Sequence, residues 1–418
     1  MRKPKVVIVG AGFGGLAVVR ALQKAPVDIV VIDRRNHHLF QPLLYQVAAA
    51  VLSPAEIATP IRSLLSGLPN VTVMMGEVES VDTSAKQVRA NMGDHQEKVD
   101  YDYLVLATGS RHTYFGNDHW EAIAPGLKTI DDATAIRNKM LLAFERAEMS
   151  SDPEEISRLL TIAVIGGGPT GVEMAGTISE LAHAALSREF RNINPKQTRV
   201  ILIEGSPRVL ASFPEKLSSA AANALRKLGV EVYQNARVTD CNANGVVIGD
   251  KLIPAGTIIW AAGVQASPAA AWLGVEADRA GRVKVEANFS VSGRENVFVI
   301  GDTATQTDAK GKVVPGVAQG AIQGGEHVGL QILARITGKP APAPFRYRNM
   351  GNMATIGRHA AVADFGFLRM KGGLAWWLWG IVHIFFLIGF RNRLAVMLHW
   401  LWSFLTLKRG VRLITGVK

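Results

Sequence analysis

Residues 5–16 read KVVIVGAGFGGL, and this stretch decides the fold. The apolar, β-branched run at 5–9 is typical of a buried parallel strand. A glycine-rich turn follows it, then a predicted helix over 16–23 and a second predicted strand at 28–32. This order of strand, glycine turn, helix and strand predicts a Rossmann-like unit, and therefore an α/β fold.

The turn itself has the spacing G-x-G-x-x-G through Gly10, Gly12 and Gly15, and the second strand ends at Asp33. Glycines at these positions let the backbone turn tightly and approach a pyrophosphate, to which the helix N-terminus offers N–H groups. An acid at the end of the second strand accepts hydrogen bonds from ribose hydroxyls. A glycine motif alone is weak, but strand, helix and acid together predict a dinucleotide site.

The same pattern occurs a second time further along the chain. A predicted strand at 161–165 leads into GGGPTG at 166–171, then a helix, and a strand at 199–203 ends at Glu204. The acid lies 33 residues after the last glycine, further than the usual ~20, and the long connection at 182–197 explains the excess. The sequence therefore predicts two Rossmann-like dinucleotide-binding domains.

Two other strand ends distinguish the sites. A predicted strand at 103–106 runs into Ala107-Thr108-Gly109, and another at 296–300 runs into Gly301-Asp302. In flavoproteins with two dinucleotides, such an Asp reaches the ribityl or phosphate region and the small-residue turn closes over the flavin. We therefore expect non-covalent FAD at the first site and NADH, as an exchanging substrate, at the second.

These assignments predict three domains. A discontinuous FAD domain covers 1–115 and 275–345, an NADH domain covers 116–274, and a separate C-terminal region covers 346–418. Glu204 favours NADH, because a carboxylate accepts from a free 2′-hydroxyl and repels a 2′-phosphate. Arg208 lies near in sequence and is the residue that could counter this preference.

The charge is unevenly distributed. The net charge of the chain is +11, but residues 327–418 hold 13 Lys or Arg and one acid, whereas the rest holds 33 bases and 34 acids. Because the basic excess flanks apolar, Trp-rich segments, it favours an anionic membrane surface over nucleic acid.

A single cysteine, Cys241, limits the chemistry. It excludes an internal disulfide framework, a Cys-ligated iron–sulfur cluster and a dithiol redox pair. Disulfide reductases and sulfide-oxidising quinone reductases need catalytic cysteines beside the flavin, so we expect direct electron transfer from flavin to a quinone, to oxygen or to a protein carrier.

Several longer motifs resemble those of a known family. Residues 33–48, DRRNHHLFQPLLYQVA, are similar to the signature of type II NADH:quinone oxidoreductases. Residues 316–324, GVAQGAIQG, resemble its quinone-site motif, and the tail segments 352–358, 371–373 and 389–393 are similar as well. The resemblance covers essentially the whole chain.

The resemblance implies roles for individual residues. The segment 40–42 would lie along the flavin ring, and Gln319 and Gln323 would line a quinone tunnel beneath it. Glu173 would lie on the nicotinamide side and take part in proton supply, and Lys371 would approach the flavin from the tail.

The expected site residues are then as follows. For catalysis they are Glu173, Gln319, Gln323 and Lys371. For FAD they are Gly10, Gly12, Phe13, Gly14, Gly15, Asp33, Arg34, Gln41, Pro42, Leu44, Val78, Ala107, Thr108, Gly109, Gly301, Asp302 and Ala318. For NADH they are Gly166, Gly168, Pro169, Thr170, Gly171, Glu173, Glu204, Ala262 and Gly263. No metal site is expected, because no ligand set accompanies the adjacent His37 and His38.

Simpler interpretations compete with three of these roles. Glu173, near the start of a predicted helix, is also explained as an anion that stabilises the helix dipole. Gln319 and Gln323 share a helical face, and the simpler interpretation is two solvated glutamines. We favour a site, because glycine-rich helices are costly and the small residues give room for a ligand or the flavin. The quinone-site motif has Gln323-Gly324 where the family often has Gln-Gln or Gln-His, and the tail has Asn349-Met350 where it usually has Asp-Lys. Both departures could alter quinone preference or tail packing.

The predicted function is transfer of a hydride from NADH to FAD and of two electrons to a membrane quinone, ubiquinone or menaquinone, without proton pumping. A soluble NADH oxidase or carrier-protein reductase is the alternative enzyme. An NADH-sensing flavoprotein that acts as a binding partner is the alternative of another class.

The C-terminal region at 346–418 is expected to serve membrane association and quinone access, and its tail to anchor the chain without crossing the bilayer. Residues 374–390 span roughly 25 Å as a helix, short of the ~30 Å core, and 394–407 are shorter still and end at Lys408-Arg409. His399, Ser403 and Thr406 form a polar stripe on the second segment, which is the pattern of a helix lying in the membrane plane. A subunit interface is the competing interpretation, and a homodimer is expected.

The N-terminus shows no signal peptide, because the first residues run directly into the strand at 5–9. We therefore expect a peripheral, monotopic protein on the cytoplasmic face of the bacterial inner membrane.

Overall fold

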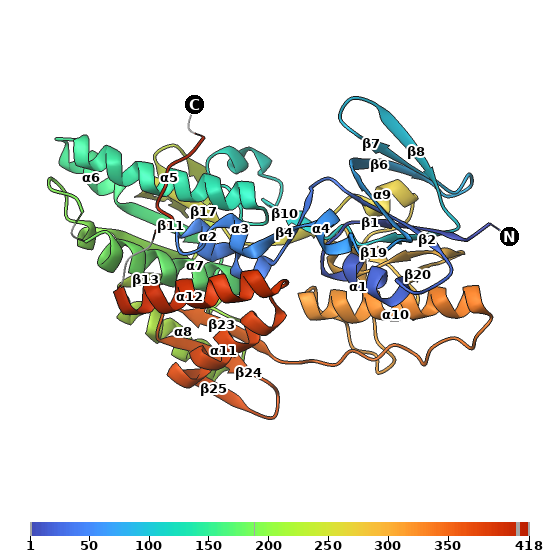
Figure 1. Ribbon diagram of the computed structural model, residues 1–418. Coiled ribbons are helices and arrows are strands. Elements are labelled where there is room, and N and C mark those ends of the chain that lie inside the picture. Colours follow the sequence, from blue (N-terminus) through green and yellow to red (C-terminus); the bar gives the residue numbers. More distant parts are fainter. Residues whose placement is uncertain (1, 188, 407–409, 417–418) are drawn as a thin grey trace. The chain divides into compact units, whose positions relative to one another are not determined.

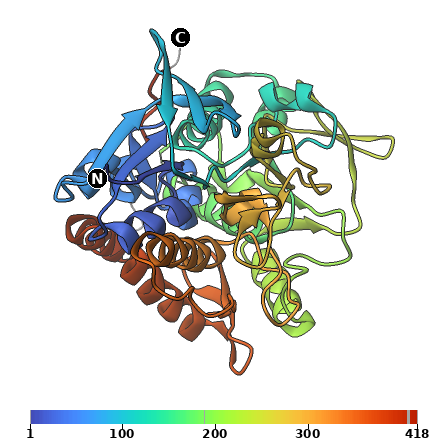
Figure 2. The ribbon, with the colours of Figure 1, turned by 90° about the vertical axis from the view of Figure 1, so that its right-hand side faces the viewer.

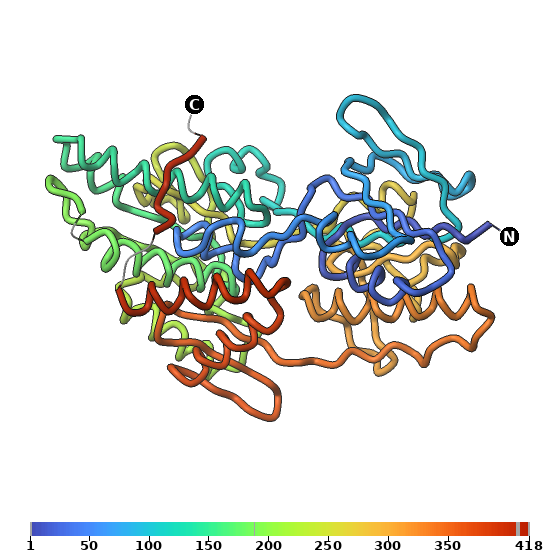
Figure 3. Tube along the Cα trace, in the orientation of Figure 1, coloured from blue at the N-terminus to red at the C-terminus, as the bar shows by residue number. Residues whose placement is uncertain are grey.

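The computed structural model describes residues 2–187, 189–406 and 410–416. The predicted basic end of the tail at Lys408-Arg409 lies outside these residues. The chain forms two compact units. Unit 1 comprises Met1–His38, Thr59–Arg111 and Val264–Met350, and unit 2 comprises Leu39–Ala58, His112–Gly263 and Gly351–Lys418. The path of the chain through each is drawn in Figure 3.

Unit 1 is built on a six-stranded sheet with the order β20-β21-β9-β1-β2-β5. All neighbours are parallel except β20, which pairs antiparallel with β21. The strands are β1 (Lys5–Val9), β2 (Asp28–Asp33), β5 (Val71–Met75), β9 (Tyr103–Leu106), β20 (Ser290–Val291) and β21 (Arg294–Val299). The first strand is buried from Val6 to Val9, as its apolar run predicts.

Helices and a meander cover this sheet. Helices α1 (Phe13–Leu22) and α10 (Ala318–Thr337) lie side by side (Figure 1, Figure 2). The antiparallel meander of β6 (Glu77–Asp82), β7 (Gln87–Asn91) and β8 (Gln96–Asp100) shares a hydrophobic core with the sheet and with α9 (Ala269–Leu273).

Unit 2 holds a four-stranded parallel sheet with the order β13-β12-β11-β17. Its strands are β11 (Thr161–Ile165), β12 (Arg199–Ile203), β13 (Val230–Tyr233) and β17 (Thr257–Trp260). The main helices are α5 (Ile130–Met149), α6 (Pro153–Leu159), α7 (Pro169–Glu180) and α8 (Glu215–Lys227). A meander of β14 (Val238–Asn242), β15 (Gly245–Ile248) and β16 (Lys251–Pro254) completes it.

The C-terminal part of unit 2 is an antiparallel sheet followed by two helices. The strands are β23 (Asn352–Ile356), β24 (Ala360–Asp364) and β25 (Arg369–Gly372), and the helices are α11 (Gly373–Phe386) and α12 (Phe390–Thr406). The short helices η1 (Gln41–Leu43), α2 (Leu44–Ala48) and α3 (Pro54–Ile57) also belong to this unit. Among the described residues, no helix has the length and apolarity to span a bilayer.

The remaining elements are short. They are β3 (His37–Leu39), β4 (Ala58–Pro60), α4 (Ile61–Leu65), β10 (Ser110–His112), η2 (Asp118–Ala122), η3 (Leu181–Ala185), η4 (Pro195–Gln197), β18 (Val264–Ala266), β19 (Val283–Lys284), η5 (Gly301–Thr303) and β22 (Ala304–Thr305).

The predicted α/β class and both predicted strand–glycine turn–helix–strand units are present. The compact units place the segment 39–58 and the tail with the second Rossmann sheet. The functional division into 1–115 with 275–345, 116–274 and 346–418 remains a proposal about cofactors.

Candidate functional site

The first glycine turn forms a closed bend at the carboxyl end of β1. A Cβ atom at Gly15 would lie 1.9 Å from the carbonyl oxygen of Gly10. Gly10 has a φ of +101°, and a Cβ there would lie 2.4 Å from the carbonyl oxygen of Ala107. Both positions therefore require glycine, because the turn and the end of β9 touch backbone to backbone.

The turn leads into the N-terminus of α1, whose N-cap is Gly12. A Cβ at Gly12 would meet no protein atom within 4 Å, so its backbone faces open space. Asp33 lies beside it, because its carboxylate accepts hydrogen bonds from the backbone N–H groups of Ala11 at 2.7 Å and Arg35 at 2.8 Å. An open helix N-terminus with an acid at its edge suits a pyrophosphate and its ribose.

The two strand ends predicted to mark the flavin domain meet in unit 1. Thr303 donates to the carbonyl oxygen of Gly109 at 3.1 Å, and Ser110 donates to the carboxylate of Asp302 at 2.8 Å. A Cβ at Gly301 would lie 3.2 Å from that of Ala321, at the start of α10. The turns after β9 and β21 and the N-terminal part of α10 therefore surround one place.

Other residues predicted for FAD are located as follows. Phe13 packs edge-on against the ring of His38 with centroids 5.1 Å apart. Arg34 forms an exposed ion pair with Glu77, and the side chain of Val78 is part of the hydrophobic core. Gln41, Pro42 and Leu44 belong to unit 2, where Gln41 donates to the carbonyl oxygen of Lys128.

The adjacent histidines have structural partners. The Nδ1 atom of buried His38 lies 2.9 Å from the carbonyl oxygen of Ala11, and burial lowers the pKa of its imidazole. His37 Nδ1 contacts Asn36. The described ranges hold no cluster of His, Cys, Asp and Glu that fits a metal ion.

Gln319 and Gln323 share one face of α10, and that face binds the segment after the helix. Gln319 accepts hydrogen bonds from the Tyr347 hydroxyl and from the Met350 N–H. Gln323 accepts from the Arg348 N–H at 2.9 Å and donates to the Arg348 carbonyl oxygen at 3.0 Å. The pair therefore holds residues 347–350 beside the start of α10.

The glycines of α10 contradict our interpretation of them as room for a ligand. A Cβ at Gly325 would lie 2.3 Å from the carbonyl oxygen of Gly14, and one at Gly324 would lie 3.1 Å from the ring of Phe289. A Cβ at Gly320 would meet the carbonyl oxygen of Pro315 at 2.7 Å. Protein atoms fill this space, because the small residues allow α10 to pack closely on its neighbours.

The second glycine turn, in unit 2, repeats the geometry of the first. A Cβ at Gly171 would lie 1.8 Å from the carbonyl oxygen of Gly166, and Gly166 packs against the backbone of Ala261 and Ala262. Gly168 is the N-cap of α7 and faces open space. It is followed by the exposed Pro169 and Thr170, and Gly263 lies against the ring of Phe115.

Glu204 occupies the position of Asp33 in this second turn. Its carboxylate accepts from the N–H of Gly167 at 2.5 Å and from the N–H of Ser206 at 2.7 Å, and the Ser206 hydroxyl binds it as well. Arg208 donates to the carbonyl oxygen of Ala211 instead. The Glu204 carboxylate is therefore oriented by the glycine turn and by the residues that follow it.

Glu173 lies in the second turn of α7 and is 8% exposed. Its carboxylate accepts from the Thr355 N–H of β23 at 3.4 Å. Burial raises the pKa of the Glu173 carboxyl to about 8, and the Thr355 hydrogen bond opposes this only in part. Burial therefore opposes an anion at this position, which is the form that the helix-dipole interpretation needs.

A group of residues around Glu173 was missed from the sequence. Tyr45 and Gln46 of α2, Thr355 of β23 and Trp400 of α12 form a connected hydrogen-bond network with it. The only signal was the polar pair Tyr-Gln inside the otherwise apolar run at 43–52. Lys371, by contrast, is exposed on β25.

The tail helices carry a large exposed apolar surface, here called the apolar face. Its members are Leu374, Trp377, Ile381, Phe385, Phe386, Phe390, Leu394, Met397, Leu398, Leu401, Trp402, Phe404 and Leu405. The polar stripe lies on the opposite side: Ser403 is buried, and His399 contacts Glu56 of α3 at 3.1 Å. The stripe therefore docks α12 on the protein, and the apolar side faces outward.

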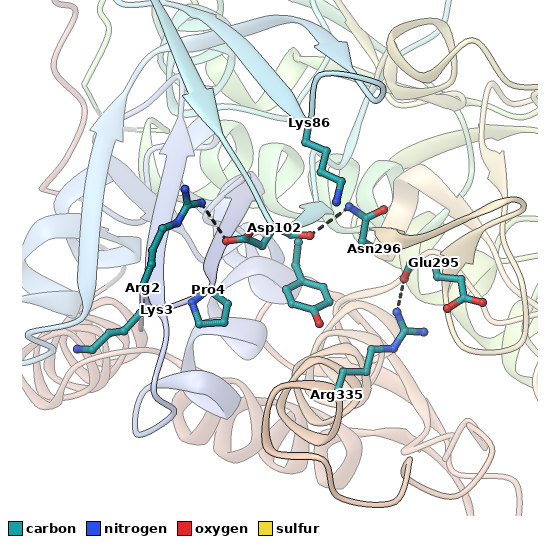
Figure 4. A pocket seen from close by; sticks show the side chains of 9 residues that line it. Arg2, Lys3, Pro4, Lys86, Asp102, Glu295, Asn296 and Arg335 are labelled. Atoms are coloured by element: carbon teal, nitrogen blue, oxygen red, sulfur yellow. Dashed lines mark hydrogen bonds and ion pairs between the residues drawn. The ribbon is translucent and has the colours of Figure 1, made fainter.

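One recess of ≈ 680 Å³ lies at the amino ends of β1, β9 and β21 (Figure 4). Its lining includes Arg2, Asp102, Lys86 and Arg335, of which Arg2 is paired with Asp102 and Arg335 donates to the carbonyl oxygen of Glu295. The glycine turn leaves the same strands at their carboxyl ends, so this recess is distinct from the dinucleotide site.

Comparison with known proteins agrees with this geometry. The pyridine nucleotide-disulphide oxidoreductase family model matches residues 4–325, and the NDH2 C-terminal domain model matches residues 349–408. Two type II NADH:quinone oxidoreductases of Mycobacterium tuberculosis are 46% and 45% identical to the chain, each over 99% of its length and over 91% and 89% of their own.

Solved structures share the fold. The NDH2 of Plasmodium falciparum in complex with NADH superposes with a TM-score of 0.89 at 22% identity, covering 98% of this chain and 100% of that one. The sulfide:quinone oxidoreductase of Aquifex aeolicus reaches 0.74 at 19% identity, covering 93% and 92%. The full-length match to the mycobacterial enzymes shows that the chain belongs to the type II NADH:quinone oxidoreductases, within the pyridine nucleotide-disulphide oxidoreductase family.

Proposed function

We propose that this chain oxidises NADH and reduces a membrane quinone through non-covalently bound FAD, without pumping protons. The observation that carries the proposal is a glycine turn with an acid beside it that occurs twice in a member of this family. We call each of these a cradle: the first is Gly10–Gly15 with Asp33, and the second is Gly166–Gly171 with Glu204. Two open helix N-termini, each with an acid beside it, suit two dinucleotides.

The first cradle is assigned to FAD. The N–H groups at the start of α1 would bind the pyrophosphate, Asp33 the ribose, and Asp302 the ribityl or phosphate region. When bound, the flavin supplies the chemistry of accepting a hydride and passing on two electrons. The chain supplies alignment and exclusion of water.

The second cradle is assigned to NADH. The Glu204 carboxylate, fixed by Ser206 and Gly167, would accept a hydrogen bond from the 2′-hydroxyl of the ribose and repel a 2′-phosphate by its charge. Arg208, which could attract a 2′-phosphate, donates to the carbonyl oxygen of Ala211 instead. Gly168 leaves space for the backbone to approach the pyrophosphate.

Gln319 and Gln323 are assigned to the quinone site. Their amides anchor residues 347–350, so they would shape the entrance as well as offer polar groups to a quinone carbonyl. Lys371 would act from the tail, as the resemblance to the family implies.

Glu173 is assigned to proton supply. Reduction of a quinone to a quinol consumes two protons, and a donor must hold its proton at the working pH. Because burial raises its pKa to about 8, the Glu173 carboxyl holds a proton at neutral pH.

The apolar face is assigned to a membrane surface. Thirteen large apolar side chains of α11 and α12 are exposed, Arg391 is exposed in the first turn of α12, and residues 327–418 hold 13 bases and one acid. Apolar burial combined with attraction to anionic lipids is how helices lie in a membrane surface. We place the chain on the cytoplasmic face, where NADH is supplied, and expect a homodimer there.

The test of membrane binding uses Ile381→Glu and Leu401→Glu in the full chain. Each places a charge on the apolar face, and removing even ~1.4 kcal/mol of apolar binding lowers membrane partitioning about tenfold. The measured quantity is the fraction of protein bound to vesicles that contain anionic lipid. Met149→Glu, at an exposed site on α5, is the control. If the variants instead bind vesicles normally but change from dimer to monomer in detergent, the face is a subunit interface.

The test of the activity is reduction of a short-chain quinone by NADH with purified, FAD-loaded protein. Quinone reduction with one quinol formed per NADH, at low oxygen uptake, supports the proposal. Rapid oxygen uptake with slow quinone reduction would favour the NADH oxidase instead, and slow reoxidation by every acceptor would favour an NADH-sensing flavoprotein.

A further inference from the structure

A hydrogen-bond network inside unit 2 joins the tail helix α12 to Glu173. At one end, the Thr355 N–H donates to the Glu173 carboxylate at 3.4 Å. The Thr355 side-chain oxygen lies 3.0 Å from the hydroxyl of Tyr45, and both side chains are buried. Thr355 is thus paired with Ala361 in the β23–β24 ladder, contacts Glu173 through its N–H and contacts Tyr45 through its side chain.

At the other end, the indole of Trp400 donates to the side-chain oxygen of Gln46 at 2.8 Å. The amide nitrogen of Gln46 donates to the hydroxyl oxygen of Tyr45 at 3.0 Å. Trp400 itself packs on Trp379 of α11, with ring centroids 5.3 Å apart. The network therefore begins in the two tail helices and ends at the carboxyl of α7.

The chemistry of the indole and the amide sets the direction of the bonds from Trp400 to Gln46 and from Gln46 to Tyr45. An indole N–H can only donate, so Gln46 must turn its oxygen toward Trp400 and its NH₂ group toward Tyr45. Because the Tyr45 oxygen accepts from Gln46, its hydrogen is available to Thr355. Trp400 therefore fixes the orientation of the Gln46 amide, and through it the arrangement at Thr355.

The surroundings leave few other groups to act on Glu173. Tyr45 is the titratable group that faces it from α2, and burial raises the pKa of the phenol, so it stays a neutral donor. Glu180, further along α7, is paired with Arg358 next to β23. The other packed elements carry Glu215, Lys216, Arg226 and Lys227 of α8, all exposed, and Arg199 of β12, paired with Glu231 of β13. They also carry the exposed Tyr233 of β13 and His183 of η3, whose ring lies 2.9 Å from the carbonyl oxygen of Thr198.

We propose that Tyr45, Gln46 and Trp400 are positioning residues for Glu173, so that docking of the tail helix α12 sets the place of the carboxyl that supplies a proton to the quinone. The inference rests on the proposed function of Glu173. The network does not conduct protons, because its last contact is a backbone N–H. It orients Thr355, whose N–H donates a hydrogen bond that stabilises the charged form of the carboxyl.

The experiment is the pH dependence of kcat for NADH-driven reduction of a short-chain quinone, with FAD-loaded, full-length protein. A donor that must be protonated gives an activity that falls at alkaline pH, and Glu173→Gln removes that alkaline limb. In Trp400→Phe and Tyr45→Phe, the Thr355 side chain loses its orienting contact, so the Thr355 N–H is positioned less well and the hydrogen bond to the charged form of Glu173 weakens. The limb then moves to higher pH by roughly 0.5 to 1 unit.

Thr355→Val provides a second variant at the same contact, should Tyr45→Phe not fold. It keeps the shape of the side chain and removes the hydroxyl, and it produces the same shift. The double variant with Tyr45→Phe shifts the limb no further than either single change, because both remove one interaction.

The controls are Tyr233→Phe, exposed on β13, and Thr239→Val, exposed on β14, which match the substitutions made in the network. Both leave the alkaline limb in its wild-type place. FAD content and the amplitude of flavin reduction by NADH confirm folding of every variant.

The possible outcomes distinguish the positioning role from the proposed role of Glu173 in proton supply. A limb that shifts in the network variants and stays in the controls supports the proposal. A limb that disappears in Glu173→Gln but stays unmoved in Trp400→Phe and Thr355→Val overturns the positioning role alone. A limb that survives Glu173→Gln overturns both the positioning role and the assignment of Glu173 to proton supply.

Discussion

The hydroxyl of Tyr45 lies 3.0 Å from the side-chain oxygen of Thr355, although 310 positions separate them in the chain. The contact joins the motif at 33–48, which resembles the family signature, to the first strand of the tail. Because Thr355 also contacts Glu173 through its N–H, one short strand connects the N-terminal motif, the second Rossmann helix and the C-terminal region.

The buried carboxyl of Glu173 should make the stability of the protein depend on pH. Its folded pKa is about 8 against an ordinary value of 4.5. Between these pH values the folded state binds more protons than the unfolded state, so the free energy of unfolding falls as pH rises. The total effect is at most about 5 kcal/mol, and it should be absent in Glu173→Gln.

This prediction is checked by chemical unfolding at pH 5 and pH 8.5. The loss of stability between the two pH values should be smaller in Glu173→Gln than in wild type. Glu145→Gln, at an exposed site on α5, should keep the wild-type dependence. Equal losses in wild type and Glu173→Gln would show that the carboxyl is solvated.

Arg358 should stabilise the packing of α12 on the rest of unit 2. Its guanidinium lies 3.7 Å from the carboxylate of Glu180, which is 9% exposed, and donates to the carbonyl oxygen of Ser403 in α12. Arg358→Gln leaves a buried carboxylate without its cation, which costs about 1–3 kcal/mol. Thermal unfolding and hydrogen exchange of α12 are the measurements.

The matched control is Arg369→Gln. Arg369 pairs with Asp364 in the same small sheet but is 59% exposed, so its loss should cost under about 1 kcal/mol. If the two variants lose equal stability, the packing of α12 does not depend on the ion pair of Arg358 with Glu180.

Local patterns allowed the prediction of both dinucleotide cradles. The Gly10–Gly15 and Gly166–Gly171 turns, and the acids Asp33 and Glu204 after them, follow from steric and dipole rules that act within a few tens of residues. The Gly-Asp and Ala-Thr-Gly strand ends were predictable for the same reason. The structure brings them together in unit 1.

Long-range packing explains what the sequence could not show. The helix-start position of Glu173 suggested an anion, but β23, about 180 residues away, buries it. The glycines of α10 suggested room for a ligand, but Gly14 and Phe289 fill that space. The stripe of His399 and Ser403 was visible, yet its inward direction depends on partners such as Glu56.

Glu204 should determine the preference for NADH over NADPH. Its carboxylate is held by Gly167 and Ser206 at the position that a 2′-substituent would approach. Glu204→Gln removes the repulsion of a 2′-phosphate while keeping the size of the side chain, so the ratio of kcat/KM for NADPH to that for NADH should rise about tenfold, or ~1.4 kcal/mol. Glu215→Gln, exposed at the start of α8, should leave the ratio unchanged, and an unchanged ratio in Glu204→Gln would assign the preference to other residues.

The middle glycines of the two cradles should act on cofactor binding rather than on folding. A Cβ at Gly12 or Gly168 meets no protein atom within 4 Å, so alanine fits in the free protein. A pyrophosphate bound at the helix N-terminus would come into contact with that methyl group. Gly12→Ala should therefore lower FAD content, and Gly168→Ala should raise KM for NADH, each by about tenfold or more for a loss of ~1.4 kcal/mol.

Gly67→Ala, also free of contacts within 4 Å, is the control for the substitution itself. Equal thermal stability of the three variants without cofactor, together with unchanged FAD content and KM, would mean that neither cradle binds a dinucleotide in this way.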